Sequence, residues 1–489
     1  MQRQIKRVGI GLVAAFLAIF FQLNYLQIFA AESIASNSAN VRRLLAEYSI
    51  KRGDILTEDG VVIARSEDTG GRLRYRRTYP EGELYGHITG YYSFLYGTDR
   101  IEAAYNDALL GDSGVLSMQD IEDRLFDSGE QGDDVQLTIN SELQRLAQQQ
   151  LAGQSGSVVA LDPTTGEIKA MWSTPSYDPS PLASHKSGPA KAYYESLDPK
   201  TVDTPLLSKV TSRSYPPGST FKVVTAAAAL ESGRYQRDST FPDPDSIDLP
   251  KTDLDLTNFT KTSCTGQSEI DLFTAMRVSC DTTFALIGLE LHDEIIEMSE
   301  AMGFNEQIPL DVGTQPSDFP RVGDDAEPFR AYAGIGQGDV AATPLQMALV
   351  ASSVANRGTL MRPHLMKRIT DPSGDVVREY EPETMSTPMS PTTAATLKEM
   401  MVAVVQEGTG TSAQIPGIEV AGKTGTAQSV EGANPHAWFI AFAPASNPKI
   451  AIAVLVENGG SFGSEATGGA VAAPIARAII EADRRISGW

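Results

Sequence analysis

An apolar run near the N-terminus separates a short tip from everything that follows it. Residues 8–21 are strongly apolar, and a run diluted by polar side chains continues to residue 31. About 20 apolar residues are enough to span a bilayer. Three basic residues, Arg3, Lys6 and Arg7, precede the run, which favours a cytoplasmic N-terminus and an exported remainder. We therefore expect residues 1–31 to form a cytoplasmic tip and a single-pass transmembrane anchor in the plasma membrane.

A cleaved signal peptide is the alternative interpretation of the same run. The run is long for a signal peptide, and no clear small-x-small cleavage site follows it, so an uncleaved anchor is favoured. The chain carries 40 Lys and Arg against 62 Asp and Glu, a formal charge of −22. This excess of negative charge argues against nucleic acid or polyphosphate as a partner and indicates a solvated acidic surface.

Length and local pattern divide the exported part into two units. At 489 residues the chain is too long for one average domain. Residues 32–132 are turn-rich, and the Asp59-Gly60 step between short apolar runs predicts a hairpin. This segment contains no cluster of catalytic residue types, so we expect it to be a mixed α/β pedestal or interaction domain. Residues 133–489 are expected to form the second domain.

Strand and helix patterns in the second domain predict an α+β fold. Alternating or continuous apolar stretches predict strands over residues 156–161, 168–172, 436–443 and 449–456, and a closing helix over residues 466–482. Strands at both ends with helices between them favour an antiparallel sheet that is flanked by helices and joins the first strands to the last.

A serine three residues before a lysine gives the first sign of chemistry. Ser219 and Lys222 open an Ala-rich run that predicts a helix ending near Ser232, after a loop that contains two prolines and Gly218. At this spacing the two side chains share one helix face, so the lysine amine can take the serine proton and activate a nucleophile. The pair alone is weak evidence, because it occurs by chance about once or twice in a chain of this length.

A second segment, Lys423-Thr424-Gly425-Thr426, is far more specific. It follows alternating residues 418–421, which predict a strand. A Lys-Thr-Gly-Thr string is expected by chance in roughly one chain of this length per hundred or more. The lysine can bind a substrate carboxylate, both threonines can hydrogen-bond to it, and the glycine permits close backbone approach. The backbone N–H groups of Thr426 and Ser219 can together hold an oxyanion. The alternative is an edge strand with a solvated lysine.

Ser279-Cys280-Asp281 lies between these segments and by itself predicts only a polar loop before a helix. The order Ser-x-x-Lys, Ser-x-Asp, Lys-Thr-Gly, with about 60 and 140 residues between the motifs, is similar to that of penicillin-binding proteins and serine β-lactamases. The chain resembles class B, monofunctional penicillin-binding proteins of the actinobacterial penicillin-binding protein A type over nearly its whole length. Residues 52–55 and 334–338 also resemble segments of that family.

The resemblance implies a serine β-lactamase/transpeptidase-like domain with peptidoglycan D,D-transpeptidase activity. Ser219 would attack the carbonyl between the two terminal D-alanines of a stem peptide, and the acyl group would pass to an amine of a neighbouring stem. Lys222 would be the base, Ser279 a proton relay, and residues 423–426 the carboxylate site. β-Lactam antibiotics would acylate the same serine. The implied partners are peptidoglycan stem peptides, a separate membrane glycan polymerase and divisome or elongation proteins, and no cofactor is implied.

Asp281 departs from the family pattern, which has Asn at this position. An amide can donate a hydrogen bond to the acyl-chain carbonyl, whereas an ionised carboxylate can only accept one. We expect Asp281 instead to hold Lys222 charged in the resting state, which would slow acylation.

The two cysteines, Cys264 and Cys280, are 16 positions apart, and export permits them to pair. A disulfide is favoured over two buried thiols. Such a loop could contribute on the order of 3 kcal/mol by restricting the unfolded chain, and it would fix Ser279. The five histidines show no metal-ligand spacing, so no metal site is expected. Trp438 is expected to belong to the core.

Two other functions share this chemistry. A serine β-lactamase needs an additional activated water for deacylation, and no acidic loop suited to that task is evident. A β-lactam sensor should carry further membrane spans or a cytoplasmic effector, and neither is recognisable in the sequence. The pedestal, at about 100 residues, is too short to hold a second, glycan-polymerising domain.

Overall fold

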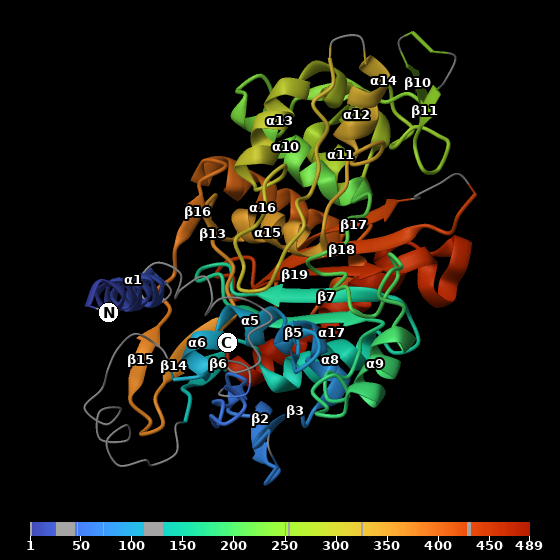
Figure 1. Ribbon diagram of the computed structural model, residues 1–489. Coiled ribbons are helices and arrows are strands. Elements are labelled where there is room, and N and C mark those ends of the chain that lie inside the picture. The colour runs from blue at the N-terminus through green and yellow to red at the C-terminus, as the bar shows by residue number, and fades with distance from the viewer. Residues whose placement is uncertain are drawn as a thin grey trace.

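Two β-sheets organise the fold (Figure 1). The computed structural model describes residues 2–25, 45, 47–71, 73–111, 131–249, 251–252, 255–323, 326–427 and 432–489. In the N-terminal part the elements are α1 (Gln2–Asn24), β1 (Ile55–Leu56), β2 (Val62–Asp68), β3 (Tyr75–Thr78), η2 (Gly82–Leu84), α4 (Gly86–Thr89), β4 (Tyr92–Ser93), β5 (Gly97–Thr98), α5 (Arg100–Ala104), α6 (Asn106–Leu109) and β6 (Asp134–Leu137).

The rest of the chain supplies the whole central sheet and two strands of the second sheet. Up to the middle of the chain its elements are α8 (Ser141–Gln150), β7 (Gly156–Leu161), β8 (Ile168–Thr174), α9 (Ser187–Ser196), η3 (Gly218–Phe221), α10 (Lys222–Glu231), β9 (Thr240–Pro242), β10 (Ser246–Asp248), β11 (Asp255–Thr257), β12 (Glu269–Asp271), α11 (Leu272–Val278), α12 (Asp281–Glu290), α13 (His292–Ala301) and α14 (Glu327–Gly334). They are followed by α15 (Pro344–Ala355), β13 (Leu360–Met361), β14 (Met366–Thr370), β15 (Val376–Glu379), β16 (Thr384–Ser386), α16 (Pro391–Gln406), η4 (Thr411–Ala413), β17 (Ala421–Ala427), β18 (His436–Ala443), β19 (Ile450–Val456), η5 (Glu457–Glu465), η6 (Gly468–Ala472) and α17 (Ala473–Ser487).

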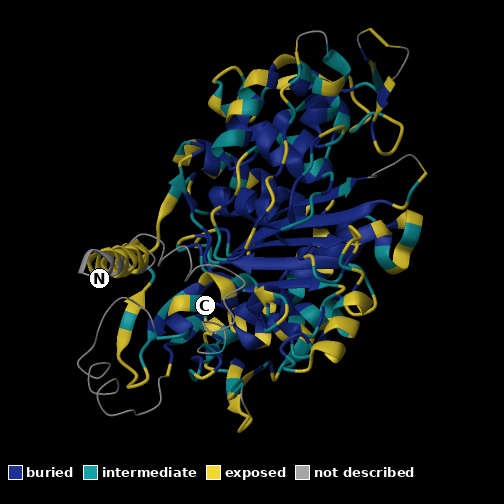
Figure 2. Ribbon diagram, viewed as in Figure 1, coloured by how far each residue is buried: buried dark blue, intermediate teal, exposed yellow. Residues whose placement is uncertain are grey.

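The central sheet has the antiparallel order β17-β18-β19-β7-β8, so the predicted strands β7 and β8 join the predicted strands near the C-terminus, as expected. Helix α15 packs on β7, β18 and β19, while α8 contacts β8 and α17 contacts β18 and β19. Every residue of β18 and β19 is buried, because helices cover both faces of the sheet (Figure 2). The predicted α+β fold is confirmed.

The second sheet gathers strands from distant parts of the chain, in the order β15-β14-β6-β1-β2-β3. Strands β1 and β2 form the predicted hairpin, in which Gly60 adopts a φ of 81°. Strand β6 pairs parallel to β1 and antiparallel to β14. The chain therefore leaves this sheet after β6, forms strands β7 and β8 of the central sheet and several helices, and returns with β14 and β15 before it adds β17, β18 and β19.

A buried carboxylate cross-links the N-terminal part. Glu102 in α5 is fully buried and accepts hydrogen bonds from the Nε atoms of Arg52 and Arg77, each at 2.6 Å. The hydroxyl of Tyr79 donates to the same carboxylate at 3.2 Å. Burial raises the pKa of Glu102, but the two guanidinium groups outweigh burial and the net shift is downward. This cluster ties α5 to β3 and to the segment that precedes β1.

Helix α1 carries the apolar run with which the sequence begins. Its described side chains are exposed, in contrast to the buried central sheet (Figure 2). No helix in the described ranges combines the length and the apolar character that a bilayer span requires. Residues 26–31 of the expected anchor, and the expected boundary at residue 32, lie outside the described residues.

Candidate active site

Ser219 lies on a tight turn at the start of a buried helix. The sequence predicted an α-helix from this residue onward, whereas the structure has the short 3-10 helix η3 first and α10 from Lys222. The N–H of Gly218 donates to the carbonyl of Gly336 at 2.9 Å. A Cβ added to Gly336, whose φ is 71°, would lie 2.3 Å from the Gly218 oxygen. The segment 334–338 therefore supports the serine turn through close backbone packing, which only glycine permits.

Lys222 is fully buried one helical turn after the serine. Its Nζ donates to Oδ1 of Asp281 at 2.7 Å and to the backbone oxygen of Ser279 at 2.8 Å. Burial lowers the pKa of Lys222, and the Asp281 carboxylate partly opposes that shift. No hydrogen bond joins Lys222 to the hydroxyl of Ser219, both of which the structure describes. Asp281 therefore forms the expected ion pair with Lys222, while the expected charged resting state of the amine stays a prediction.

Ser279 bridges two buried lysines. Its Oγ accepts hydrogen bonds from Nζ of Lys423 at 2.8 Å and from Nζ of Lys222 at 3.4 Å. Ser279 ends α11 in the left-handed region, with φ 63° and ψ 45°, a backbone conformation that residues other than Gly rarely adopt. Burial lowers the pKa of Lys423 well below its ordinary value, and the nearby charge of Lys222 adds to this effect. The three residues form a polar relay between two elements distant in sequence.

Strand β17 carries the Lys-Thr-Gly-Thr segment at the edge of the central sheet. It begins at Ala421, later than the predicted start at residue 418. Its only strand partner in the described sheet is β18, so its other edge can pair with an extended substrate. The hydroxyls of Thr424 and Thr409 lie 2.5 Å apart, and the N–H of Gly468 donates to Oγ1 of Thr426 at 3.4 Å.

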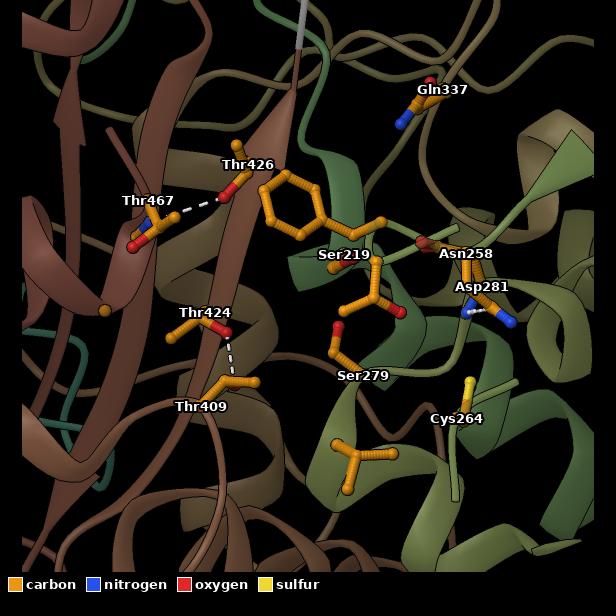
Figure 3. A pocket seen from close by; sticks show the side chains of 15 residues that line it. Ser219, Asn258, Cys264, Ser279, Asp281, Gln337, Thr409, Thr424, Thr426 and Thr467 are labelled. Atoms are coloured by element: carbon orange, nitrogen blue, oxygen red, sulfur yellow. Dashed lines mark hydrogen bonds between the residues drawn. The ribbon is translucent and has the colours of Figure 1, made fainter. Parts of the chain in front are cut away.

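These elements enclose a cavity of about 460 Å³ (Figure 3). Five predicted catalytic or substrate-binding residues line it, namely Ser219, Ser279, Asp281, Thr424 and Thr426, together with Cys264 of the predicted disulfide. Lys222 and Lys423 are buried behind this wall, and Gly425 packs against the serine turn, where an added Cβ would meet the Pro217 oxygen at 2.8 Å.

Gln337 of the segment 334–338 also lines the cavity, whereas other cavity residues were not predicted from the sequence: Asn258, Phe259, Thr260, Val278, Thr409, Thr467, Gly468 and Gly469. Most of them belong to two short runs, residues 258–260 in a loop and residues 467–469 at the start of η6, where no period or spacing marks them. Thr409 is an exception, because it lies in the repeat Gly408-Thr409-Gly410-Thr411, and glycines so spaced indicate close backbone approach.

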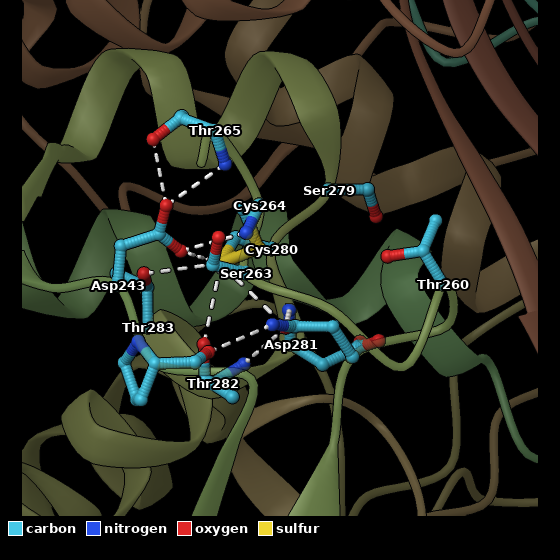
Figure 4. Close-up of a disulfide and its surroundings, with 12 residues drawn as sticks. Asp243, Thr260, Ser263, Cys264, Thr265, Ser279, Cys280, Asp281, Thr282 and Thr283 are labelled. Carbon is cyan, nitrogen blue, oxygen red and sulfur yellow. Dashed lines mark hydrogen bonds between the residues drawn. A yellow bond between two sulfur atoms is a disulfide. The ribbon is translucent and has the colours of Figure 1, made fainter. Parts of the chain in front are cut away.

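A disulfide fixes the middle motif (Figure 4). Cys264 and Cys280 are bonded, with their Cα atoms 5.7 Å apart. The side-chain oxygen of Asn258 accepts from the N–H groups of Asp281 and Thr282, both at 3.0 Å. The disulfide and the Asn258 side chain both restrain the first turn of α12. Together they fix the positions from which Ser279 and Asp281 reach the cavity. Trp438, predicted to belong to the core, is fully buried.

Comparisons with known proteins agree with this geometry. The family described as "Penicillin binding protein transpeptidase domain" matches residues 156–481, and the "Penicillin binding protein A dimerisation domain" matches residues 52–135. The chain is 39% identical to the peptidoglycan D,D-transpeptidase PbpA of Mycolicibacterium smegmatis, over 99% of each chain. It is 37% identical to PbpA of Mycobacterium tuberculosis, also over 99% of each chain.

Solved structures show the same fold. A ceftriaxone acyl-enzyme complex of penicillin-binding protein A from M. tuberculosis superimposes with a TM-score of 0.84 at 37% identity, covering 90% of this chain and 99% of the other. The D,D-transpeptidase domain of a peptidoglycan glycosyltransferase from Eggerthella lenta gives a TM-score of 0.78 at 33% identity, with the same coverage of 90% and 99%.

Proposed function

This chain belongs to the penicillin-binding protein transpeptidase family, and from that premise we propose how its own residues carry out the reaction. The chain is a peptidoglycan D,D-transpeptidase that β-lactams acylate, and we assign the acyl group to Ser219. One observation carries this assignment. Ser219 lines a cavity whose wall also holds the Ser279 hydroxyl, and that hydroxyl accepts hydrogen bonds from two buried lysines, Lys222 and Lys423.

In the acylation step, the Ser219 hydroxyl attacks the carbonyl between the two terminal D-alanines of a stem peptide. Its proton passes to Lys222, whose pKa burial lowers, so that a larger fraction of the amine is neutral. The Ser279 hydroxyl relays a proton to the leaving nitrogen, the C–N bond breaks, and D-alanine departs. In the second step an amine of a neighbouring stem attacks the ester carbonyl and releases Ser219.

In this proposal, residues of strand β17 bind the substrate. Lys423, Thr424 and Thr426 bind the terminal carboxylate, and the N–H groups of Ser219 and Thr426 stabilise the oxyanion. The closeness of the two segments supports the second role, since a Cβ on Gly218 would lie 2.9 Å from the Thr426 oxygen. Gly425 allows this contact because it has no side chain.

Labelling with a fluorescent penicillin tests the assignment of Ser219. We expect the wild-type protein to form a covalent adduct that is stable to denaturation and gel electrophoresis, and we expect Ser219→Ala to form none. Ser214→Ala, in the same loop, serves as the matched control and should label like wild type. Labelling of Ser219→Ala would disprove the assignment. Rapid loss of the label from wild type would favour a β-lactamase.

Asp281 sets the charge of the base in this proposal. Its carboxylate raises the pKa of Lys222, against the larger effect of burial, so Asp281→Asn should lower that pKa further. Because the base must be neutral, the rising limb of acylation rate against pH should then move to lower pH. At neutral pH we expect penicillin acylation to be unchanged or faster. A fall of about tenfold or more, over 1 kcal/mol of barrier, would refute this account.

We also propose the three-part organisation and the membrane attachment. Residues 1–31 form the cytoplasmic tip and anchor, residues 32–132 the pedestal, and residues 133–489 the extracytoplasmic transpeptidase domain. The apolar run and the basic residues before it support the anchor. A membrane glycan polymerase and divisome or elongation proteins are the proposed partners. Full-length protein should stay with membranes after carbonate extraction, and its release would argue against an anchor.

A further inference from the structure

A buried carboxylate lies at the base of the loop that carries Ser219, outside the residues that line the cavity. Glu457 follows β19 and is 7% exposed. Its Oε1 accepts a hydrogen bond from the hydroxyl of Tyr215 at 2.5 Å. Its Oε2 accepts from the hydroxyl of Ser155 at 2.5 Å and from the ammonium group of Lys209. Three side chains, those of Ser155, Lys209 and Tyr215, therefore meet at a carboxylate that is more than 240 positions from each of them.

The cluster is charged and closely hydrogen-bonded. Burial raises the pKa of Glu457, but the hydrogen bonds from Lys209, Ser155 and Tyr215 outweigh burial and the net shift is downward. An ionised acceptor of this kind forms stronger and more directional hydrogen bonds than a neutral one. Arg213 adds a longer ion pair to the same carboxylate, at 3.7 Å. The Tyr215 hydroxyl is therefore held at a defined point.

The backbone between Tyr215 and the nucleophile Ser219, four positions later, is held by hydrogen bonds and prolines. The backbone of Tyr215 exchanges two hydrogen bonds with Ala342, at 2.9 and 2.8 Å. The next residue, Pro216, accepts from Nε1 of Trp438 at 3.0 Å, and its ring fixes one of the two backbone dihedrals. A second proline follows, and then Gly218, which is held by the backbone. The backbone of residues 215–218 is therefore restrained, and a displacement of Tyr215 is expected to displace Ser219 as well.

We infer that Glu457 is a positioning residue for acylation, because its hydrogen bond to Tyr215 fixes the loop that presents Ser219. This inference rests on the proposed role of Ser219. It adds a group that touches neither substrate nor reacting atoms and lies outside all three catalytic motifs. A displacement of about 1 Å at a reacting atom can change a rate by roughly a hundredfold, so a small relaxation of the loop is measurable.

Tyr215→Phe tests the inference, because it removes the hydroxyl and keeps the ring in place. We expect the acylation rate at saturating penicillin to fall about tenfold, while the dissociation constant of the non-covalent complex changes by less than about twofold. Glu457→Gln should give a fall in the same parameter, since the amide oxygen still accepts but carries no charge. Tyr235→Phe is the matched control, because it removes another tyrosine hydroxyl bonded to a glutamate, Glu290, and should leave the rate unchanged.

The outcomes separate the positioning role from a purely structural one. A lower unfolding temperature for Tyr215→Phe with a wild-type saturating rate, after correction for active protein, would overturn the inference. A weaker non-covalent complex with an unchanged saturating rate would overturn it as well. Should Glu457→Gln fail to fold, Tyr215→Phe still decides the question, because it leaves the ion pair with Lys209 intact. If wild type itself is not acylated, the proposed function fails first and the inference fails with it.

Discussion

Replacing Lys222 with Met is expected to slow penicillin acylation of Ser219 by about a thousandfold or more at neutral pH. General-base assistance typically contributes roughly 10² to 10⁴ in rate, and Lys222 is the base that the proposed mechanism assigns to the serine hydroxyl. Met suits the buried position because it is apolar and of similar length. Stopped-flow measurement of adduct formation gives the rate, and equilibrium competition with the labelled penicillin gives the affinity.

The same variant leaves Asp281 without its partner, so loss of the base must be separated from the effect of an unpaired carboxylate. The double variant Lys222→Met/Asp281→Asn provides that control, because it removes both charges. Both variants should be equally slow if the amine acts as the base. Acylation of either variant at more than about a tenth of the wild-type rate would exclude Lys222 from that role.

Replacing Glu102 with Ala is expected to lower the free energy of unfolding by about 3–5 kcal/mol, because it leaves two buried guanidinium groups, those of Arg52 and Arg77, without a counter-charge. Denaturant or thermal unfolding measures the loss. Glu67→Ala is the control, since its ion pair with Arg76 is exposed and should contribute less than about 1 kcal/mol. A loss for Glu102→Ala no larger than that of the control would show that the cluster does not stabilise the fold.

The stability that Glu102 provides should also depend on pH. Its pKa is lower in the folded than in the unfolded state, so the ionised form stabilises the fold. The contribution is complete above the unfolded-state pKa of a glutamate, about 4.3, and is lost as the pH falls through the lower folded-state value. In the Glu102→Gln variant, the free energy of unfolding should therefore depend less on pH in this acidic range than it does in the wild type.

Features marked by local pattern could be predicted from the sequence. The central strands β18 and β19 are long apolar runs that end in clear turns, and the three motifs have a spacing that chance rarely produces. The disulfide was favoured because the chain has two cysteines in an exported segment, whereas the contact between Asp281 and Lys222 was expected from the family resemblance, which brings the motifs into one site.

Features created by contacts between distant segments could not be predicted. The 3-10 turn at Ser219 depends on the packing of Gly336 against Gly218, and nothing in the local sequence distinguishes it from the start of an α-helix. Asn258 acquires its role only because α12 begins beside it. Thr409 meets Thr424 across two elements that the sequence places 15 positions apart.

The return of β14 and β15 to the N-terminal sheet has a consequence for how the protein is made. A ribosome delivers β1, β2, β3 and β6 long before β14, so during synthesis the edge of β6 lacks the partner it has in the finished fold. The N-terminal sheet cannot be completed until residues 366–379 have emerged, by which time most of the cavity wall has also been made. A gene fragment that ends near residue 132 therefore encodes only half of that sheet's strands. The N-terminal sheet therefore cannot form in full without the segment that returns to it.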